Sequence, residues 1–307
     1  MTTVPNIDAL LIHPGGDPEG GEVRQGGGLW RTIGRAFTAN RLAVLGVGLI
    51  VVIVGFCFLG PLIYHTEQFY TNLAAANLAP SAAHPLGTDY LGYDELGRLM
   101  AGGRSSIEVG LAAAVMASAI GVIWGAVAGY AGGVLDAVLM RIVDVVLSIP
   151  GLFILLFIAT IIPPTLGTMI AIIALFAWLI PARLVRGEVL SLRSREYVQA
   201  VKVMGGSGPR IVARHLIPNT IGVIVVQATF AVADAILIFA VLSYLGFGLS
   251  APAASWGEML SSGTAYVYDG YWWQIYPPGV AILLIVLAFN FVGDALRDAL
   301  DVRLRQR

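Results

Sequence analysis

Few residues of this 307-residue chain are of the types that do chemistry, and their spacing excludes the commonest kinds of site. A phosphate-binding P-loop needs Gly-Lys-Ser/Thr, yet the single lysine, Lys202, lies between two valines. One cysteine, Cys57, excludes an intramolecular disulfide and a multi-cysteine metal site. The four histidines, at positions 13, 65, 84 and 215, form no His-Glu-x-x-His pair, and no Gly-x-Ser-x-Gly elbow is present. We therefore expect no catalytic residue, no metal ligand and no cofactor bound by this chain.

The polar residues that do cluster lie in one stretch, residues 195–219. Its sequence predicts a helix from about Arg193 to Met204, a break at Gly205-Gly206, and a second short helix opened by Ser207 and Pro209. Serine at an N-cap with proline in the first turn is a typical helix start. Such a helix–turn–helix would be a rigid protrusion suited to docking a partner. The plainer interpretation is a solvated basic loop that only sets the topology.

The composition indicates a membrane protein. Hydrophobic residues make up 57% of the chain and charged residues 12%, about half the fraction usual in soluble proteins. A water-soluble core of this length has no room to bury so much apolar side chain. The net charge of −1 excludes the basic surface that nucleic-acid binding needs, so the expected surroundings are a lipid bilayer and not nucleic acid.

Charge-free windows predict six membrane-spanning helices, because roughly 20 apolar residues cross a bilayer core. Residues 145–182 are too long for one crossing and contain Pro163-Pro164, so we expect two helices joined by a tight turn. The other expected spans are residues 42–64, 109–131, 221–245 and 278–296. The expected fold class is an all-α, polytopic membrane protein.

Arginine placement predicts the orientation of these spans. With the N-terminus inside, sixteen of the Lys and Arg residues fall in inside segments, and only Arg98 and Arg104 fall in outside segments. This bias predicts that both termini are cytoplasmic. Within the second span, Gly121, Gly125 and Gly129 repeat every four positions, a spacing that predicts close approach of another helix.

The N-terminal segment divides into two parts. Residues 1–28 are polar and rich in Gly and Pro, which indicates a disordered cytoplasmic tail and not a cleaved signal. Leu29, Trp30 and Phe37 share one helical face with Ile33. Residues 29–41 are therefore expected to form an amphipathic interfacial helix, unless these side chains only anchor the first span.

The polar stretch resembles the EAA motif of permease subunits in binding-protein-dependent ABC importers. That pattern is Glu-Ala-Ala, three residues, Gly, nine residues, Ile-x-Leu-Pro; the glycine-to-proline spacing is intact here, and Val201 replaces the second alanine. In that family the loop carries a coupling helix that docks in a groove of the cytoplasmic ATPase. The ATPase-coupling residues implied by the resemblance are Glu196, Gln199, Ala200, Gly205, Ser207, Pro209, His215 and Pro218.

Other motifs place the resemblance in the dipeptide, oligopeptide and nickel class, on the side of its C-type permeases. His84-Pro85-Leu86-Gly87-Thr88-Asp89 is similar to the outside segment of these permeases. Residues 242–248 resemble the end of span five, and residues 293–301 the C-terminal signature. The resemblance implies a type I ABC importer permease fold over residues 42–307, with its coupling loop at about 187–219.

The function implied by this resemblance is that of a transmembrane subunit of an ATP-driven importer of dipeptides or oligopeptides, and not of an enzyme. The implied partners are a homologous second permease, two cytoplasmic ATPase subunits that bind ATP and Mg, and an extracytoplasmic solute-binding protein. The implied location is the cytoplasmic membrane of a bacterium. The cargo stays open, because dipeptides, longer peptides and nickel chelates share this class.

An acidic residue within a predicted span gives rise to an alternative functional hypothesis. The family often has an acid where Phe239 stands, and Asp234 lies five residues earlier; both are candidate pathway residues, since an ionisable group inside a span is a functional hypothesis by default. A structural hydrogen bond would account for Asp234 equally well. The competing hypothesis is a proton-coupled secondary transporter using Asp234 or Asp144, which predicts an internal repeat that we do not find. The aromatic residues of 250–276 would contact the binding protein, gate the path, or form an interfacial belt.

Overall fold

The structure is a computed structural model that describes residues 37, 40–66 and 70–305, and side chains as far as residue 300. The predicted tail (1–28) and nearly all of the predicted interfacial helix (29–41) lie outside the described residues. Within the described ranges the regular elements are helices, and the only β-type pairing is an isolated bridge between Thr88 and Asp94. The predicted all-α fold class is confirmed.

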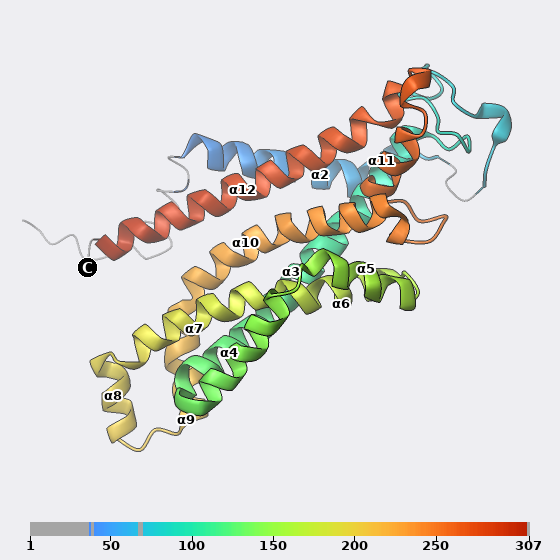
Figure 1. The fold of residues 1–307 in the computed structure, drawn as a ribbon. Coiled ribbons are helices and arrows are strands. Elements are labelled where there is room, and N and C mark those ends of the chain that lie inside the picture. Colours follow the sequence, from blue (N-terminus) through green and yellow to red (C-terminus); the bar gives the residue numbers. More distant parts are fainter. Residues whose placement is uncertain (1–36, 38–39, 67–69, 306–307) are drawn as a thin grey trace, which may run out of the picture.

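The two ends of the chain contribute long helices that run together. Helix α2 (Arg41–Ile63) begins where Oδ1 of Asn40 accepts a hydrogen bond from the Leu42 N–H at 3.0 Å, which satisfies one of the free donors of a first turn. It lies beside α12 (Tyr276–Arg305) (Figure 1). A Cβ at Gly46 would fall 2.8 Å from the Ala288 carbonyl oxygen, so this glycine lets the two backbones approach.

Helix α3 (Glu95–Ala131) is longer than the span predicted from its charge-free window, which began at residue 109. The helix starts at its cap Asp94, whose Oδ1 accepts from the Gly97 N–H at 2.8 Å. Arg98 and Arg104, which the window excluded, are accommodated because each forms an ion pair with a glutamate. The predicted start was therefore wrong, since paired charges interrupt the apolar run without ending the helix.

Two bent helix pairs follow. Helices α4 (Gly133–Leu147) and α5 (Gly151–Ile161) meet at 81°, and α6 (Leu166–Ala177) and α7 (Leu179–Arg193) meet at 43°. The turn predicted at Pro163-Pro164 is confirmed, because α5 ends before it and Thr165 caps α6 after it. The prediction of a single helix from residue 145 to that turn was wrong. The chain bends at Pro150, which lacks the backbone donor that a continuing helix needs.

The described helices accommodate the six predicted spans. Four are long and apolar enough to cross a membrane alone, and the total reaches six when each bent pair counts as one span. The fifth span is part of a continuous 40-residue helical stretch, Gly208–Phe247, that contains α9 (Gly208–Ile211), a π-helical turn (Val212–Leu216) and α10 (Ile217–Leu242).

The predicted second short helix after Gly205-Gly206 is thus the start of this long stretch. Its beginning is confirmed, with Ser207 at the N-cap position and Pro209 in the first turn. Its predicted end was wrong, because the π-helical turn absorbs Pro218, which has no N–H to donate, without breaking the helix.

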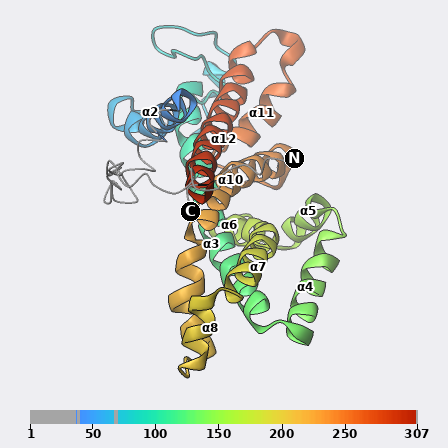
Figure 2. The same ribbon diagram turned by 90° about the vertical axis from the view of Figure 1, so that its left-hand side faces the viewer.

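The helices run between two dissimilar ends. Helix α8 (Glu196–Val203) lies at one end, whereas residues 70–94 and α11 (Trp256–Thr264) lie at the opposite end (Figures 1 and 2). Buried apolar clusters hold the bundle together along its length, and the smallest of them lies next to α8.

Candidate functional site

A small apolar core fixes the loop around α8 to the rest of the chain. Val198 of α8 is buried, as are two residues of the helical stretch that follows the turn. They pack with apolar side chains of α7 and α3, so the loop is a folded element and not a solvated strand of chain. The buried members of this cluster are Ala126, Val185, Val189, Val198, Ile211 and Leu216.

The turn that closes α8 is a Schellman motif. Gly205 has φ +83°, the Gly206 N–H donates to the Val201 carbonyl at 2.9 Å, and the Gly205 N–H donates to the Lys202 carbonyl at 3.1 Å. These two bonds satisfy carbonyls that the helix end would leave free. The predicted break at Gly205-Gly206 is confirmed, and the positive φ explains why glycine stands there.

Most of the sequence-predicted coupling residues are exposed and lie together at this end of the bundle. The Gln199 side chain is turned back, because its Nε2 donates to the Arg193 carbonyl at 2.9 Å and so links α8 to the end of α7. His215 is half-buried, in the π-helical turn. The exposed members are Glu196, Gln199, Ala200, Gly205, Ser207, Pro209 and Pro218.

Two residues at the tip of the loop were missed in the sequence. Val203 is 87% exposed and Met204 is 76% exposed, directly before the turn. An adjacent apolar pair between Lys202 and Gly205 was the available signal. Exposed apolar residues rimmed by polar ones are typical of surfaces that bind another protein.

The predicted stripe of glycines on α3 packs against α7, as expected. A Cβ at Gly121 would lie 2.9 Å from the Trp178 carbonyl oxygen, and one at Gly125 would clash with the Ala182 carbonyl oxygen. A Cβ at Gly129 would lie 2.9 Å from the Arg186 carbonyl oxygen. The predicted close helix approach is confirmed, and α7, which leads into α8, is the helix that approaches.

The two candidate pathway residues of α10 lie on different faces. Asp234 is exposed on the surface of the chain, and the described residues form no ion pair with it. Phe239 is fully buried in the core, in the same cluster as Ala235. The structure therefore does not bring these side chains together. Asp144, the other acid considered, is ion-paired with Arg183 of α7.

The outer segment predicted from residues 84–89 is a hydrogen-bonded structure whose last three residues are buried. Thr88 is fully buried; its Oγ1 accepts from the Leu78 N–H at 2.8 Å, and its carbonyl accepts from Trp273 Nε1 and Gln274 Nε2, both at 3.1 Å. Gly87 has φ +73°, and a Cβ there would fall 2.5 Å from the Leu78 carbonyl oxygen. These residues bind the segment to the chain that leads into α12.

Asp89 extends this network to α11. Its Oδ1 accepts from the Leu91 and Tyr93 N–H groups at 2.9 and 2.8 Å, and its Oδ2 lies 3.8 Å from Arg98 Nε. Arg98 also donates to Oε2 of Glu258 at 2.9 Å, so one guanidinium links the outer segment, α3 and α11. Burial raises the pKa of the Asp89 carboxyl above its usual value, although the two backbone donors and Arg98 oppose this shift.

His84 and Tyr64 meet at the carboxylate that caps α3. His84 Nδ1 and the Tyr64 hydroxyl each lie 2.9 Å from Oδ2 of Asp94. All four predicted outer residues, His84, Gly87, Thr88 and Asp89, therefore serve contacts within the chain.

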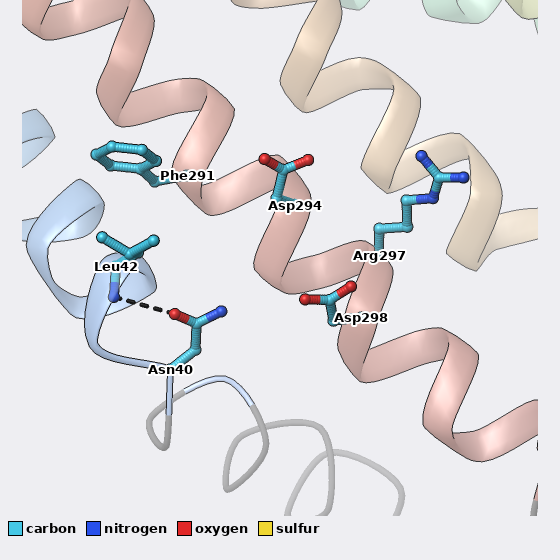
Figure 3. Close-up of a pocket in the computed structure, with 6 residues that line it drawn as sticks. All are labelled: Asn40, Leu42, Phe291, Asp294, Arg297 and Asp298. Atoms are coloured by element: carbon cyan, nitrogen blue, oxygen red, sulfur yellow. Dashed lines mark hydrogen bonds between the residues drawn. The ribbon is translucent and has the colours of Figure 1, made fainter.

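One pocket, of about 490 Å³, lies between the start of α2 and the last turns of α12 (Figure 3). The oxygen of Asn40 is already used as the helix cap, and the three charged side chains all come from α12 and point in different directions. The described residues contain no group of three or more His, Cys, Asp or Glu that could hold a metal ion. The lining residues are Asn40, Leu42, Phe291, Asp294, Arg297 and Asp298.

The fold and this arrangement define the class of protein. Its apolar helices are those of a multi-pass membrane protein, with a structured polar segment at one end and an anchored loop with an apolar tip at the other.

Comparison with known proteins gives the family. Residues 121–306 match the model for the binding-protein-dependent transport system inner membrane component, and residues 28–80 match the N-terminal TM domain of oligopeptide transport permease C. The chain belongs to this family of binding-protein-dependent transport permeases. The resemblance inferred from the loop and the outer motifs is confirmed.

Individual relatives support the assignment over most of the chain. The dipeptide transport system permease protein DppC of Bacillus subtilis (strain 168) is 40% identical over 272 residues, which are 89% of this chain and 85% of that protein. The oligopeptide transport system permease protein OppC of the same organism is 41% identical over 279 residues, 91% of each chain. OppC of Haemophilus influenzae is 36% identical over 283 residues, 92% of this chain and 91% of that protein.

Proposed function

We propose that this chain is the membrane-spanning permease subunit of an ATP-driven importer that moves dipeptides or oligopeptides into a bacterial cell. Two of its relatives, a dipeptide and an oligopeptide transport permease, support the substrate class. The chain pairs with a homologous permease, two cytoplasmic ATPases dock beneath the pair, and an outside solute-binding protein delivers the cargo. ATP and Mg are bound by the ATPases, so this subunit is not itself an enzyme.

The observation that carries the proposal is the anchored loop with an apolar tip. Val198 fixes α8 to the core, and Val203 and Met204 are exposed directly before the turn. A rigid loop of this kind does not deform when a docked ATPase moves, so it transmits the displacement to the adjoining helices. Closure of the ATPase dimer then moves the helices that flank the loop, and the path between the two permeases opens to one side at a time.

The position of Asp234 supports a substrate path between this chain and its partner permease. It is a carboxylate in an otherwise apolar helix, on an exposed face of α10 that also carries Leu237 and Val241. A charge inside a membrane faces a bundle interior or a water-filled cavity. Asp234 therefore faces the partner permease or the path, and Asp234→Asn is expected to slow uptake without lowering the amount of the complex in the membrane.

Transport in proteoliposomes tests the proposal. The subunit is reconstituted with its partner permease, both ATPases and the binding protein, and uptake of radiolabelled tri-alanine is followed. Uptake is expected to require internal ATP, to stop with vanadate, and to continue when a proton ionophore collapses the gradient. If the ionophore stops uptake and vanadate does not, the chain is a proton-coupled transporter and the proposal is wrong.

A further inference from the structure

Helix α4 is joined to the rest of the chain differently in its two halves. Val143 of the second half is fully buried in an apolar cluster, with Met140 and Val146 packed against it. In the first half only Asp136 is buried, whereas Val134, Leu135 and Val138 are half or more exposed. The first half therefore takes its position from the few directional contacts that it makes.

The strongest of these contacts is a two-point ion pair with α7. Arg186 Nε and Nη2 donate to the two carboxylate oxygens of Asp136 at 2.5 and 2.7 Å. The Asp136 side chain is 11% exposed and that of Arg186 is 33% exposed. Two parallel bonds to one carboxylate fix orientation as well as distance, which a single contact does not. Asp144 and Arg183 form a second pair, but both side chains are about half exposed.

The same part of α7 is held firmly on its other side. Arg186 lies in the turn that packs on Gly125 of α3, where a Cβ would fall 2.9 Å from the Arg186 nitrogen. Seven residues later, Arg193 Nη1 donates to the carbonyls of Gly129 and Tyr130 at 3.0 and 3.3 Å, at the end of α3. Helix α7 is thus fixed to α3 along its last two turns.

Helix α7 continues almost directly into the coupling loop. It ends at Arg193, and α8 begins at Glu196. The hydrogen bond from Gln199 to the Arg193 carbonyl joins the two helices across this short link. A displacement of α8 is therefore transferred to α7, and from there it reaches α4 through the contacts of Arg186.

We propose that Asp136 and Arg186 are a positioning pair that makes α4 follow the coupling loop. This inference rests on the proposed function, because it takes the loop to be the element that the ATPases move. Helices α4 and α5 meet at 81° at the bend around Pro150. A shift of α4 together with α7 therefore also moves this bend and changes the orientation of α5. Neither residue touches substrate; the pair acts through the position of α4.

Coupling in the reconstituted importer tests the pair. Asp136→Asn is compared with the charge exchange Asp136→Arg/Arg186→Asp, and ATP hydrolysed per tri-alanine transported is measured for each. Asp136→Asn is expected to keep co-purifying ATPase and ATP hydrolysis while the ratio rises roughly fivefold or more, the lower range of coupling between sites. The exchange is expected to restore the ratio. Arg183→Met is the matched control, expected to leave the ratio unchanged, because an exposed pair contributes little.

A distance measurement separates positioning from general stability. Spin labels are placed at Val138→Cys on α4 and Ser191→Cys on α7; Cys57 is buried and can remain. In the wild-type background the distance between labels should be the same in nucleotide-free and vanadate-trapped complexes. With Asp136→Asn it should shift or broaden on trapping. If Asp136→Asn does not fold, the neutral pair Asp136→Asn/Arg186→Gln, which leaves no lone charge, replaces it with the same expectation.

The possible failures are distinct. If the wild-type chain recruits no ATPase, the proposed function is wrong and the positioning pair with it. If the wild type transports and the Asn variant transports at the wild-type ratio, only the pair is wrong. The pair is also wrong if the label distance changes on trapping in the wild type, or if the exchange restores thermal stability without restoring the ratio.

Discussion

The glycine that ends α8 allows a substitution whose effect is purely conformational. Gly205 has φ +83°, and no atom lies within 4 Å of the position that a Cβ would take. A new side chain therefore meets no neighbour, and the penalty comes only from the left-handed backbone, about 1–2 kcal/mol for a residue with a Cβ. That penalty shifts an equilibrium by a factor of roughly 5–30.

The expected consequence is a misplaced α8. With Gly205→Val the turn either stays strained or relaxes toward negative φ, and relaxation breaks the Schellman bonds of Gly205 and Gly206 and tilts α8 relative to α9. The spans do not depend on this turn, so the subunit should reach the membrane in normal amount and pair with its partner. Co-purifying ATPase and peptide uptake should both fall. Gly205→Asn should fall between glycine and valine, because asparagine tolerates positive φ.

The matched control has the same backbone strain at the opposite end of the molecule. Gly270 has φ +82° and is also open, with nothing within 4 Å of its Cβ position. Gly270→Val should therefore destabilise its own turn to a similar degree and leave ATPase recruitment intact. Full ATPase recruitment and full uptake by the Gly205→Val protein would refute the argument that this turn sets the docking surface.

Three further outcomes follow from packing and charge. Arg98→Met should lower the free energy of unfolding by about 3 kcal/mol, measured by thermal unfolding in detergent, because it leaves the buried carboxylate of Asp89 and the partly buried one of Glu258 without a cation. Arg104→Met, at an exposed pair, should change it by no more than about 0.5 kcal/mol. Gly125→Ala should cost about 1–3 kcal/mol and reduce the yield of monodisperse protein, whereas Gly48→Ala, which meets no atom within 4 Å, should be tolerated. Because the pKa of Asp89 is raised in the folded chain, its contribution to stability is greatest at low pH and is lost as pH rises through that pKa. Asp89→Asn does not titrate and keeps one acceptor oxygen, so its melting temperature relative to wild type should rise between pH 4 and pH 7; a constant difference would contradict this.

Local signals in the sequence were sufficient to predict the conformation of the loop around Gly205. Gly205 is needed by a turn that involves only its neighbours, and Ser207 and Pro209 mark a helix start that is also local. The start of α3, which was predicted wrongly, depends on a distant partner. Arg98 extends α3 beyond its apolar window because Glu258, 160 residues away, neutralises it. Pairing at that separation leaves no pattern in a window of 20 residues.

The outer segment shows the same limit. Asp89, Thr88 and Gly87 were recognised as a motif, but their motif did not reveal that they are buried. Their partners Trp273 and Gln274 come from the far end of the chain. Trp273 had been considered among the aromatic residues that contact the binding protein, gate the path or form an interfacial belt, and Gln274 had not been considered. The pair of Asp136 and Arg186 was missed for a related reason, since each residue alone is only a charge beside a span.

The length of α10 has a mechanical consequence. Its 26 residues, at 1.5 Å each, make a rod about 39 Å long, somewhat longer than a bilayer core is thick. A tilt of about 5° around the midpoint of such a rod displaces each end by roughly 1.7 Å, and in opposite directions. The end that follows the π-helical turn and the end that leads toward α11 are therefore the two arms of one lever, so narrowing the gap beside one arm widens the gap beside the other.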